Sequence, residues 1–312
     1  MKLAEFSVEG DTHIGSMIDK GLIDITRFAD QTQEQRGPRT LGEALSSWDS
    51  SLGWLNRLER LAMESREVDR FLVDPVTTRL AAPVTSPSKI LCVFVNYKAH
   101  GREVGGAAPS EPIFFFKHAN CIVGDGDDVI VPEFSTKPDH EIELGVIIGR
   151  RGKNIQARDA YDYVAGYTVI NDISFRDGMT RGIAGTSLGR NLFKGKVADT
   201  SLPMGPYLVT RDEIPDPYPL MLKLKVNGEQ RQNGTTDDMI FKIPDLVESA
   251  SEGNTLLPGD VISTGTCSGV GLSTGLYLSD GDVVEAEIER VGKLRNTIRA
   301  RHNPSTQERS GN

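Results

Sequence analysis

The chain has 312 residues, with 35 basic and 44 acidic side chains and a formal net charge of -9. This acidic balance argues against nucleic acid or an anionic membrane as the main partner, so the composition favours a small-molecule ligand. The length suits one large domain or two domains of unequal size. The first ten residues contain no basic-then-apolar leader, and no apolar run approaches the ~20 residues that span a bilayer. We therefore expect a cytoplasmic protein.

Residues 1–80 are predicted to form a small α+β domain of their own. Alternating runs such as L-A-E-F-S-V predict short strands at its start. A helix is predicted from Thr40 to near Arg70, because leucines recur at three-residue spacing and would pack in the core: Leu52, Leu55, Leu58 and Leu61. The segment 81–89 holds two prolines among small polar residues, so we expect a linker there.

Residues 90–300 are dominated by short β-type runs separated by Gly, Pro and Asp. Such a pattern predicts a mainly β architecture with some α, an α+β fold. The Asn227-Gly228 pair predicts the turn of a β-hairpin. The polar segment 301–312 is expected to be a flexible tail.

The three cysteines are far apart in the chain. Their odd number indicates neither a disulfide framework nor a paired-cysteine metal site, so we expect buried thiols at Cys92, Cys121 and Cys267.

Three carboxylates lie inside apolar runs: Glu141 and Glu143 in D-H-E-I-E-L-G-V-I-I-G, and Asp172 in Y-T-V-I-N-D-I-S-F-R-D. Residues at i and i+2 of a strand point to the same face, and charges in apolar strands are costly unless they are paired or bound to a metal. The pattern therefore predicts a site for a hard cation, Mg²⁺ or Mn²⁺ rather than Zn²⁺. The alternative is an ordinary strand whose acidic face is solvated.

His100 precedes Glu103 by three residues in N-Y-K-A-H-G-R-E. If this stretch forms one helical turn, the imidazole and the carboxylate face each other, and the carboxylate raises the basicity of the ring. The pair is then a candidate general base. The alternative is a solvated pair on a surface loop.

Seven motifs occur in one order between residues 88 and 300: N-Y-K-A-H, D-H-E-I-E-L, G-Y-T-V-I-N-D-I-S-F-R-D, G-K-V-A-D-T-S-L-P-M-G-P, V-N-G-E, L-L-P-G-D-V-I-S-T-G-T and G-V-G. In this series the chain resembles the fumarylacetoacetate hydrolase family. The resemblance covers about two thirds of the chain. It implies a mixed β-roll catalytic domain preceded by a small N-terminal domain, and a homodimer.

The resemblance also implies roles for individual residues. Glu141, Glu143 and Asp172 would hold the divalent cation, and His100 with Glu103 would be the base. Lys196 would be a catalytic cation. Arg176, Lys117 and the hydroxyl of Thr266 would bind the substrate. The other histidines, at 13, 118, 140 and 302, are expected to have structural or solvent roles.

Three residues depart from the family pattern. Met179 stands where the hydrolases carry a glutamine that helps bind the oxyanion, and a thioether cannot donate that hydrogen bond. Cys267 replaces the usual proline, and Ala198 replaces an aromatic residue. These changes make hydrolysis through a tetrahedral oxyanion less secure than metal binding.

The function that we predict is metal-dependent hydrolysis of a C–C bond in a 2,4-diketo carboxylate of the acylpyruvate type. An isomerase, decarboxylase or hydratase of a small 2-keto acid is the alternative, since these reactions also need a metal-stabilised enolate. A third hypothesis, from another class, is a relative that binds a metal or ligand without catalysis.

Overall fold

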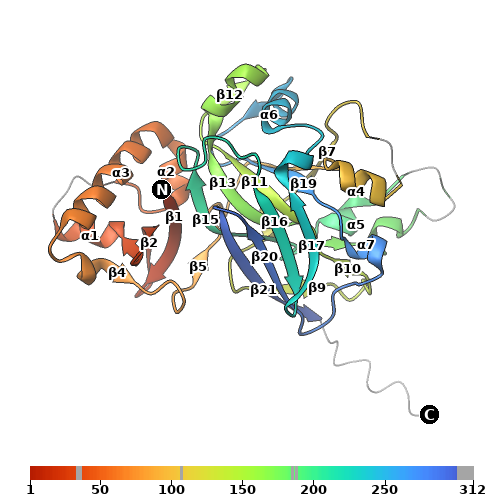
Figure 1. The fold of residues 1–312 in the computed structure, drawn as a ribbon, viewed down its shortest axis with the longest axis horizontal. Helices are drawn as coiled ribbons and strands as arrows, with labels where there is room; N and C mark the ends of the chain where they lie inside the picture. Colours follow the sequence, from red (N-terminus) through yellow and green to blue (C-terminus); the bar gives the residue numbers. More distant parts are fainter. Residues whose placement is uncertain (33–36, 106–107, 184–185, 187–188, 301–312) are drawn as a thin grey trace, which may run out of the picture.

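The computed structural model describes residues 1–32, 37–105, 108–183, 186 and 189–300. The predicted flexible tail at 301–312 lies outside the described residues. Two β-sheets form the centre of the molecule, and few helices surround them (Figure 1). The predicted mainly β fold with some α is confirmed.

The N-terminal residues form a group of strands and helices beside the larger part of the molecule (Figure 1). In chain order these elements are β1 (Lys2–Val8), β2 (Asp11–Ile18), β3 (Gly21–Asp24), α1 (Ile25–Gln31), α2 (Leu41–Ser46), α3 (Trp48–Glu64), the 3₁₀ helix η1 (Val68–Phe71) and β4 (Leu72–Val73). Strand β1 pairs with β15 (Leu202–Thr210), with Leu3 opposite Leu208. The N-terminal strands therefore continue the main sheet, and the boundary at residue 80 stays a prediction.

The helix predicted from Thr40 to near Arg70 is wrong in its extent. It is two helices, because Ser47 leaves helical geometry with φ -138° and ψ 51°. Helix α3 then ends at Glu64, where Ser65 is extended. Within α3, Leu55 and Leu58 are buried as predicted, whereas Leu52 and Leu61 are only partly buried and pack against that core.

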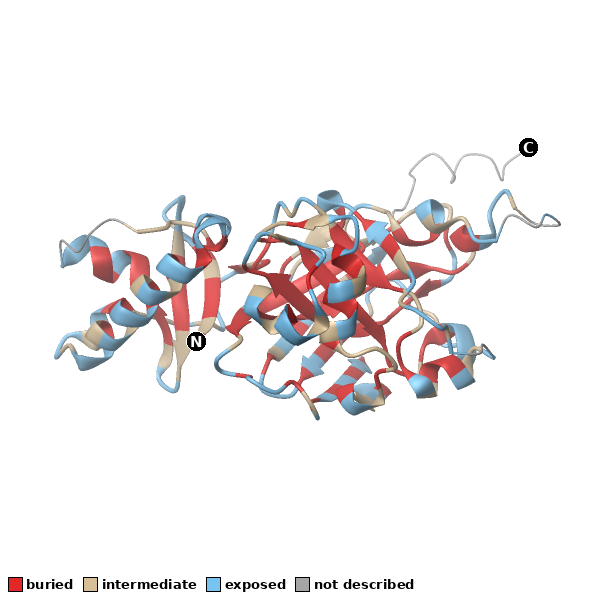
Figure 2. Cartoon of the chain, turned by 90° about the horizontal axis from the view of Figure 1, so that it is seen from above, coloured by how far each residue is buried: buried red, intermediate tan, exposed pale blue. Residues whose placement is uncertain are grey.

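The main sheet has 12 strands, and its central strands are buried on both faces. From β15 its order continues through β13 (Val164–Asn171), β11 (Ile142–Ile148), β19 (Val261–Thr266), β6 (Ile90–Val93) and β7 (Phe114–Lys117), with β5 (Leu80–Ala81) on β1 and β8 (Ile122–Val123) on β15. Strand β11 lies antiparallel to both of its neighbours. Figure 2 shows these buried strands in the middle of the molecule.

A second sheet of five strands covers one face of the main sheet. Its order is β17 (Glu229–Thr235), β16 (Met221–Val226), β20 (Val283–Ile288), β21 (Gly292–Ala300) and β9 (Asp128–Val131). Leu144 and Val146 of β11 share a core with Leu222 and Leu224 of β16. The predicted hairpin is confirmed, because Val226 is opposite Glu229 and both turn residues have positive φ, as a two-residue hairpin turn requires.

Short elements complete the fold. They are α4 (Lys98–Glu103), η2 (Ala119–Cys121), the pair β10 (Pro138–Asp139) and β14 (Ser174–Phe175), the pair β12 (Gly152–Lys153) and β18 (Thr255–Leu256), η3 (Ala157–Tyr163), η4 (Gly178–Thr180), α5 (Leu192–Lys196), η5 (Thr236–Asp238), α6 (Ile243–Ser251) and α7 (Gly271–Thr274).

Two further sequence expectations concern the cysteines and the membrane. All three cysteines are free and buried, as predicted. Among the described residues, no helix combines the length and apolar character that crossing a bilayer requires.

Two glycines give a matched test of the packing. A Cβ at Gly166 in β13 would lie 2.0 Å from the carbonyl oxygen of Val209, whereas a Cβ at Gly53 on the exposed side of α3 would meet nothing within 4 Å. We expect Gly166→Ala to lower the free energy of unfolding by about 1–3 kcal/mol through overpacking. Gly53→Ala should raise it by about 0.5–1 kcal/mol, because alanine favours a helix interior. Urea unfolding of both variants measures this, and equal shifts would contradict the packing of β13 on β15.

Candidate metal and substrate site

The three predicted metal ligands meet because of the register between β11 and β13. Ile142 is opposite Asn171, and the next position places Glu141 opposite Asp172, whose backbone N–H donates to the carbonyl oxygen of Glu141 at 2.8 Å. Glu143 follows Glu141 by two residues and so shares its face of the strand. One oxygen from each carboxylate lies within 4.8 Å of the others, and all three side chains are buried.

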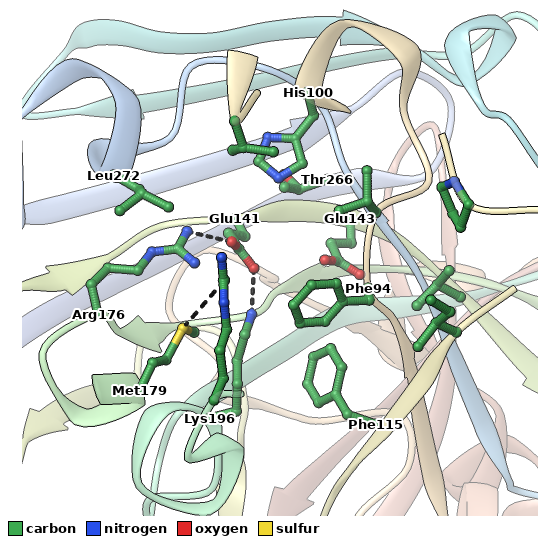
Figure 3. A pocket seen from close by; sticks show the side chains of 16 residues that line it. Phe94, His100, Phe115, Glu141, Glu143, Arg176, Met179, Lys196, Thr266 and Leu272 are labelled. Atoms are coloured by element: carbon green, nitrogen blue, oxygen red, sulfur yellow. Dashed lines mark hydrogen bonds and ion pairs between the residues drawn. The ribbon is translucent and has the colours of Figure 1, made fainter. Parts of the chain in front are cut away.

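Two cations face Glu141. Lys196 Nζ lies 2.5 Å from Glu141 Oε2 and 2.6 Å from Asp172 Oδ2. Arg176 Nη2 donates to Glu141 Oε1 (Figure 3). The Nε of Arg176 donates to Asp139 Oδ2 at 2.7 Å. Burial alone would raise the pKa of Glu141, but the charges of Arg176 and Lys196 outweigh it and hold that pKa well below its usual range.

The same contacts keep the side chains of Lys196 and Arg176 charged. Burial would lower the pKa of Lys196, but the negative charges of Asp172 and Glu141 outweigh it and raise that pKa. The pKa of Arg176 is raised likewise, because Glu141 and Asp139 outweigh the effect of burial. Both side chains are therefore cations at neutral pH.

Glu143 has no such partner, because within the described part of the chain no lysine, arginine or histidine forms an ion pair with it. Its Oε2 accepts hydrogen bonds from Ser263 Oγ at 2.6 Å and from the backbone N–H of Gly265 at 2.8 Å. Burial, followed by the charges of Asp172 and Glu141, raises the pKa of Glu143 to about 8. Without a cation this carboxyl is therefore largely protonated at neutral pH, and a divalent ion would favour its charged form.

The donor set fits a hard divalent cation. Carboxylate oxygens are the ligands that Mg²⁺ and Mn²⁺ prefer. Asp172 Oδ1 is buried and accepts no hydrogen bond from any described residue, although Lys117 Nζ lies 2.7 Å away. The ammonium of Lys117 donates instead to the carbonyl oxygens of Ile173 and Ser201. A buried carboxylate oxygen that accepts no hydrogen bond keeps its lone pairs available to coordinate a metal ion.

Lys117 does not line the pocket described below, unlike the other predicted cations. It is fully buried and contacts Asp172, so its direct role in this structure is to balance the charge of that carboxylate. Contact between Lys117 and a substrate stays a prediction.

His100 and Glu103 form the predicted pair on helix α4. His100 Nδ1 lies 3.1 Å from Glu103 Oε2, and Glu103 Oε1 accepts from the backbone N–H of Gly269 at 2.8 Å. The carboxylate is therefore fixed from two sides, and it orients the imidazole toward the pocket (Figure 3).

One cavity of about 270 Å³ joins these groups (Figure 3). Its lining includes six of the predicted site residues: His100, Glu141, Glu143, Arg176, Lys196 and Thr266. Most of the remaining wall is apolar, with Phe94, Ile113 and Phe115 among its members. The hydroxyl of Thr266 already donates to the carbonyl oxygen of Ile142 at 2.8 Å and accepts from Gln232 at 2.9 Å.

The departures from the family pattern lie at or near this cavity. Met179 is buried, lines the cavity and packs on Gly195, where a Cβ would lie 2.2 Å from its Cγ. Cys267 is buried, and its carbonyl oxygen accepts from Gln232 at 2.9 Å. Ala198 packs against the main core. At the position where the resemblance implies an oxyanion-binding glutamine, the cavity wall therefore carries a thioether, which cannot donate a hydrogen bond.

Three of the other histidines, His13, His118 and His140, are not part of the cavity lining. His13 pairs with Asp24 at 2.7 Å, and His118 is exposed. His140 is buried with Nε2 at 3.3 Å from the carbonyl oxygen of Gly269, and burial lowers its pKa. His302 lies outside the described residues.

Two site residues were missed by the sequence analysis. Asp139 holds Arg176 and accepts the backbone N–H groups of Gly271 and Leu272 at 2.6 and 2.9 Å, and its place in the D-H-E-I-E-L motif could have indicated it. Arg190 lines the cavity, but it lies in a stretch without a motif.

The metal site makes a direct prediction. Glu143→Ala should weaken Mn²⁺ binding at least about tenfold, because it removes one of three carboxylates. Titration followed by the electron paramagnetic resonance signal of free Mn²⁺ measures this. The exposed Glu133 offers the matched control, since Glu133→Ala removes an acid that is not part of the cluster. Full affinity in Glu143→Ala would rule out this carboxylate as a ligand.

Comparison with known proteins shows which family and which relatives the chain is similar to. The family model for the fumarylacetoacetate (FAA) hydrolase C-terminal domain matches residues 89–299. The chain is 39% identical over 309 residues to a protein of Bos taurus named oxaloacetate tautomerase FAHD2A, mitochondrial, covering 96% of this chain and 91% of that one. It is 37% identical over 307 residues to the oxaloacetate tautomerase YisK of Bacillus subtilis, covering 96% and 100%.

A solved structure supports the same placement. Maleylpyruvate hydrolase from Sphingobium sp. SYK-6, in complex with manganese(II) and pyruvate, superposes with a TM-score of 0.75 at 28% identity, covering 97% of this chain and 100% of that one. These relatives are enzymes with different named reactions. From the family match over most of its length, this chain belongs to the fumarylacetoacetate hydrolase family.

Proposed function

We propose that this enzyme catalyses the keto–enol tautomerisation of a small 2-keto acid of the oxaloacetate type, with a divalent cation as cofactor. The observation that carries the proposal is the His100–Glu103 pair, whose imidazole lines the same cavity as Glu141 and Glu143, at a site where Met179 stands in the place of the expected oxyanion donor. Two relatives that match nearly the whole chain are named for this reaction.

Two groups of residues in the cavity would have different roles toward the substrate. A cation held by Glu141, Glu143 and Asp172 would supply Lewis-acid stabilisation of enolate charge. Lys196 and Arg176 offset the negative charge of these acids, so the carboxylate of a keto acid does not meet uncompensated negative charge there. Mg²⁺ and Mn²⁺ both suit this donor set, and we keep both as candidates.

The His100 imidazole would move the proton. In the enolising direction it takes a proton from C3 of the keto acid, and the imidazolium then returns that proton to the C2 oxygen, so no atom is lost or added overall. Glu103 stabilises the imidazolium that forms and is itself held by Gly269. The mostly apolar wall excludes water from the enolate.

Hydrolysis of a C–C bond, our expectation from the motifs, is the second candidate. It needs a tetrahedral oxyanion to be stabilised, and the loss of one donor from such a site costs about 2.7–4 kcal/mol. Met179 is buried at that place and offers no proton. Tautomerisation passes through no tetrahedral oxyanion, so the same substitution does not penalise it.

The remaining sequence expectations stay predictions. These are a cytoplasmic location and a homodimer. One relative carries a mitochondrial name and another comes from a bacterium, so the location is expected to differ within the family.

The reaction is tested with enol-oxaloacetate, whose ultraviolet absorbance falls as it converts to the keto form. We expect the enzyme with Mg²⁺ or Mn²⁺ to accelerate this decay over Mg²⁺ or Mn²⁺ alone, and EDTA to abolish the acceleration. Pyruvate should not be released faster than without enzyme. Release of pyruvate from oxaloacetate would indicate a decarboxylase, and release of pyruvate with a carboxylic acid from acylpyruvates would indicate the hydrolase.

The base is tested by His100→Gln. We expect kcat to fall by about 10² to 10⁴, the usual contribution of a general base, while Mn²⁺ affinity stays near that of the wild type. The exposed His118 provides the control, His118→Gln. An unchanged rate in His100→Gln at saturating metal would remove the imidazole from the mechanism.

A further inference from the structure

Arg190 is a cation in the wall of the catalytic cavity without an acidic partner. It lies between η4 and α5, and the segment is fixed there because the backbone N–H of Asn191 donates to the carbonyl oxygen of Met179 at 2.8 Å. Within the described ranges, no carboxylate lies in ion-pair contact with its guanidinium. The side chain lines the cavity and is exposed to solvent.

The other charged groups of the wall are already engaged. Lys196 and Arg176 form ion pairs with the acids, and His100 is paired with Glu103. Arg190 instead places its guanidinium carbon 5.4 Å from the ring centroid of Phe94, and its Nη1 lies 3.9 Å from Met179 Sδ. A ring face and a thioether satisfy few of the five N–H donors of an arginine.

The wall of the cavity therefore holds two kinds of charged group. The carboxylates and the cations that balance them form one kind, where the keto acid group would bind. Phe94 and Met179 hold Arg190 elsewhere on the wall, and the aromatic face limits the rotamers of its side chain. An arginine fork matches a carboxylate in geometry as well as charge.

We propose that Arg190 binds the distal carboxylate of a short 2-keto dicarboxylate and so selects dicarboxylates over monocarboxylates. This inference rests on the proposed function, which supplies the 2-keto acid group at the other end of the substrate. It makes Arg190 a specificity-determining residue rather than part of the proton transfer. The cavity volume of about 270 Å³ suits a ligand of this size.

The test compares two unreactive ligands with equal carbon chains. L-malate and 2-hydroxybutanoate share the chelating hydroxy acid group, but the second has a methyl group in place of the distal carboxylate. Calorimetry on the Mn²⁺-loaded enzyme should show L-malate binding at least about tenfold more tightly, as expected for a charge-assisted hydrogen-bonded pair.

The variants are Arg190→Gln and the control Lys194→Gln. Lys194 is exposed in the same segment, and its ammonium contacts the rings of Phe134 and Phe193 outside the cavity lining. We expect Arg190→Gln to lose the preference for L-malate and keep its affinity for 2-hydroxybutanoate, while Lys194→Gln keeps both. The KM for enol-oxaloacetate should rise at least about tenfold in Arg190→Gln with a smaller change in kcat.

The outcomes separate the two proposals. Preference for L-malate that depends on Arg190 in an enzyme without tautomerase activity would sustain the dicarboxylate site and overturn the proposed reaction. Tautomerase activity with no preference for L-malate, or with a preference that survives Arg190→Gln, would overturn the role of Arg190. An equal loss of affinity for both ligands in Arg190→Gln would also overturn the role of Arg190, because the arginine would then shape the pocket rather than bind the distal group.

Discussion

The organisation of this molecule depends on three carboxylates buried at one end of two paired strands. Removing a carboxylate from water costs several kcal/mol unless positive charge or hydrogen bonds replace the solvent. Glu141 and Asp172 receive that charge from Lys196, Arg176 and Lys117. Glu143 receives only hydrogen bonds, so it is the carboxylate whose charged form most needs a metal ion.

The fold supplies these partners from separate parts of the chain. The register of β11 and β13 sets the acids side by side, helix α5 brings Lys196, and the small β10–β14 pair brings Asp139 together with the segment of Arg176. Helix α4 places His100 at the cavity from the region that follows β6. The rigid part of the site thus belongs to the sheet, and the proton-transfer pair belongs to a short helix tied to the Gly269 loop by Glu103.

Much of the site was predictable because its signals are local. Glu141 and Glu143 are two residues apart on a strand, and His100 and Glu103 are three residues apart on a helix, so the spacing already brings each pair together. Asp172 was singled out as a third acid inside an apolar run, but only the family motifs assigned it to the same site as the two glutamates, since strand register is a long-range property. The break at Ser47 depends on one backbone conformation that leucine periodicity does not encode. Arg190 could not be predicted because its proximity to Phe94 and Met179 arises only after the chain folds.

The central claim is that the three carboxylates form one metal centre, and diffraction at the manganese absorption edge tests it most directly. A crystal of the protein with Mn²⁺ should show a single strong anomalous peak within about 2.0–2.6 Å of one oxygen from each of Glu141, Glu143 and Asp172, the range of oxygen ligands to hard cations. A peak at another place, or no peak at an Mn²⁺ concentration that supports activity, would contradict the account.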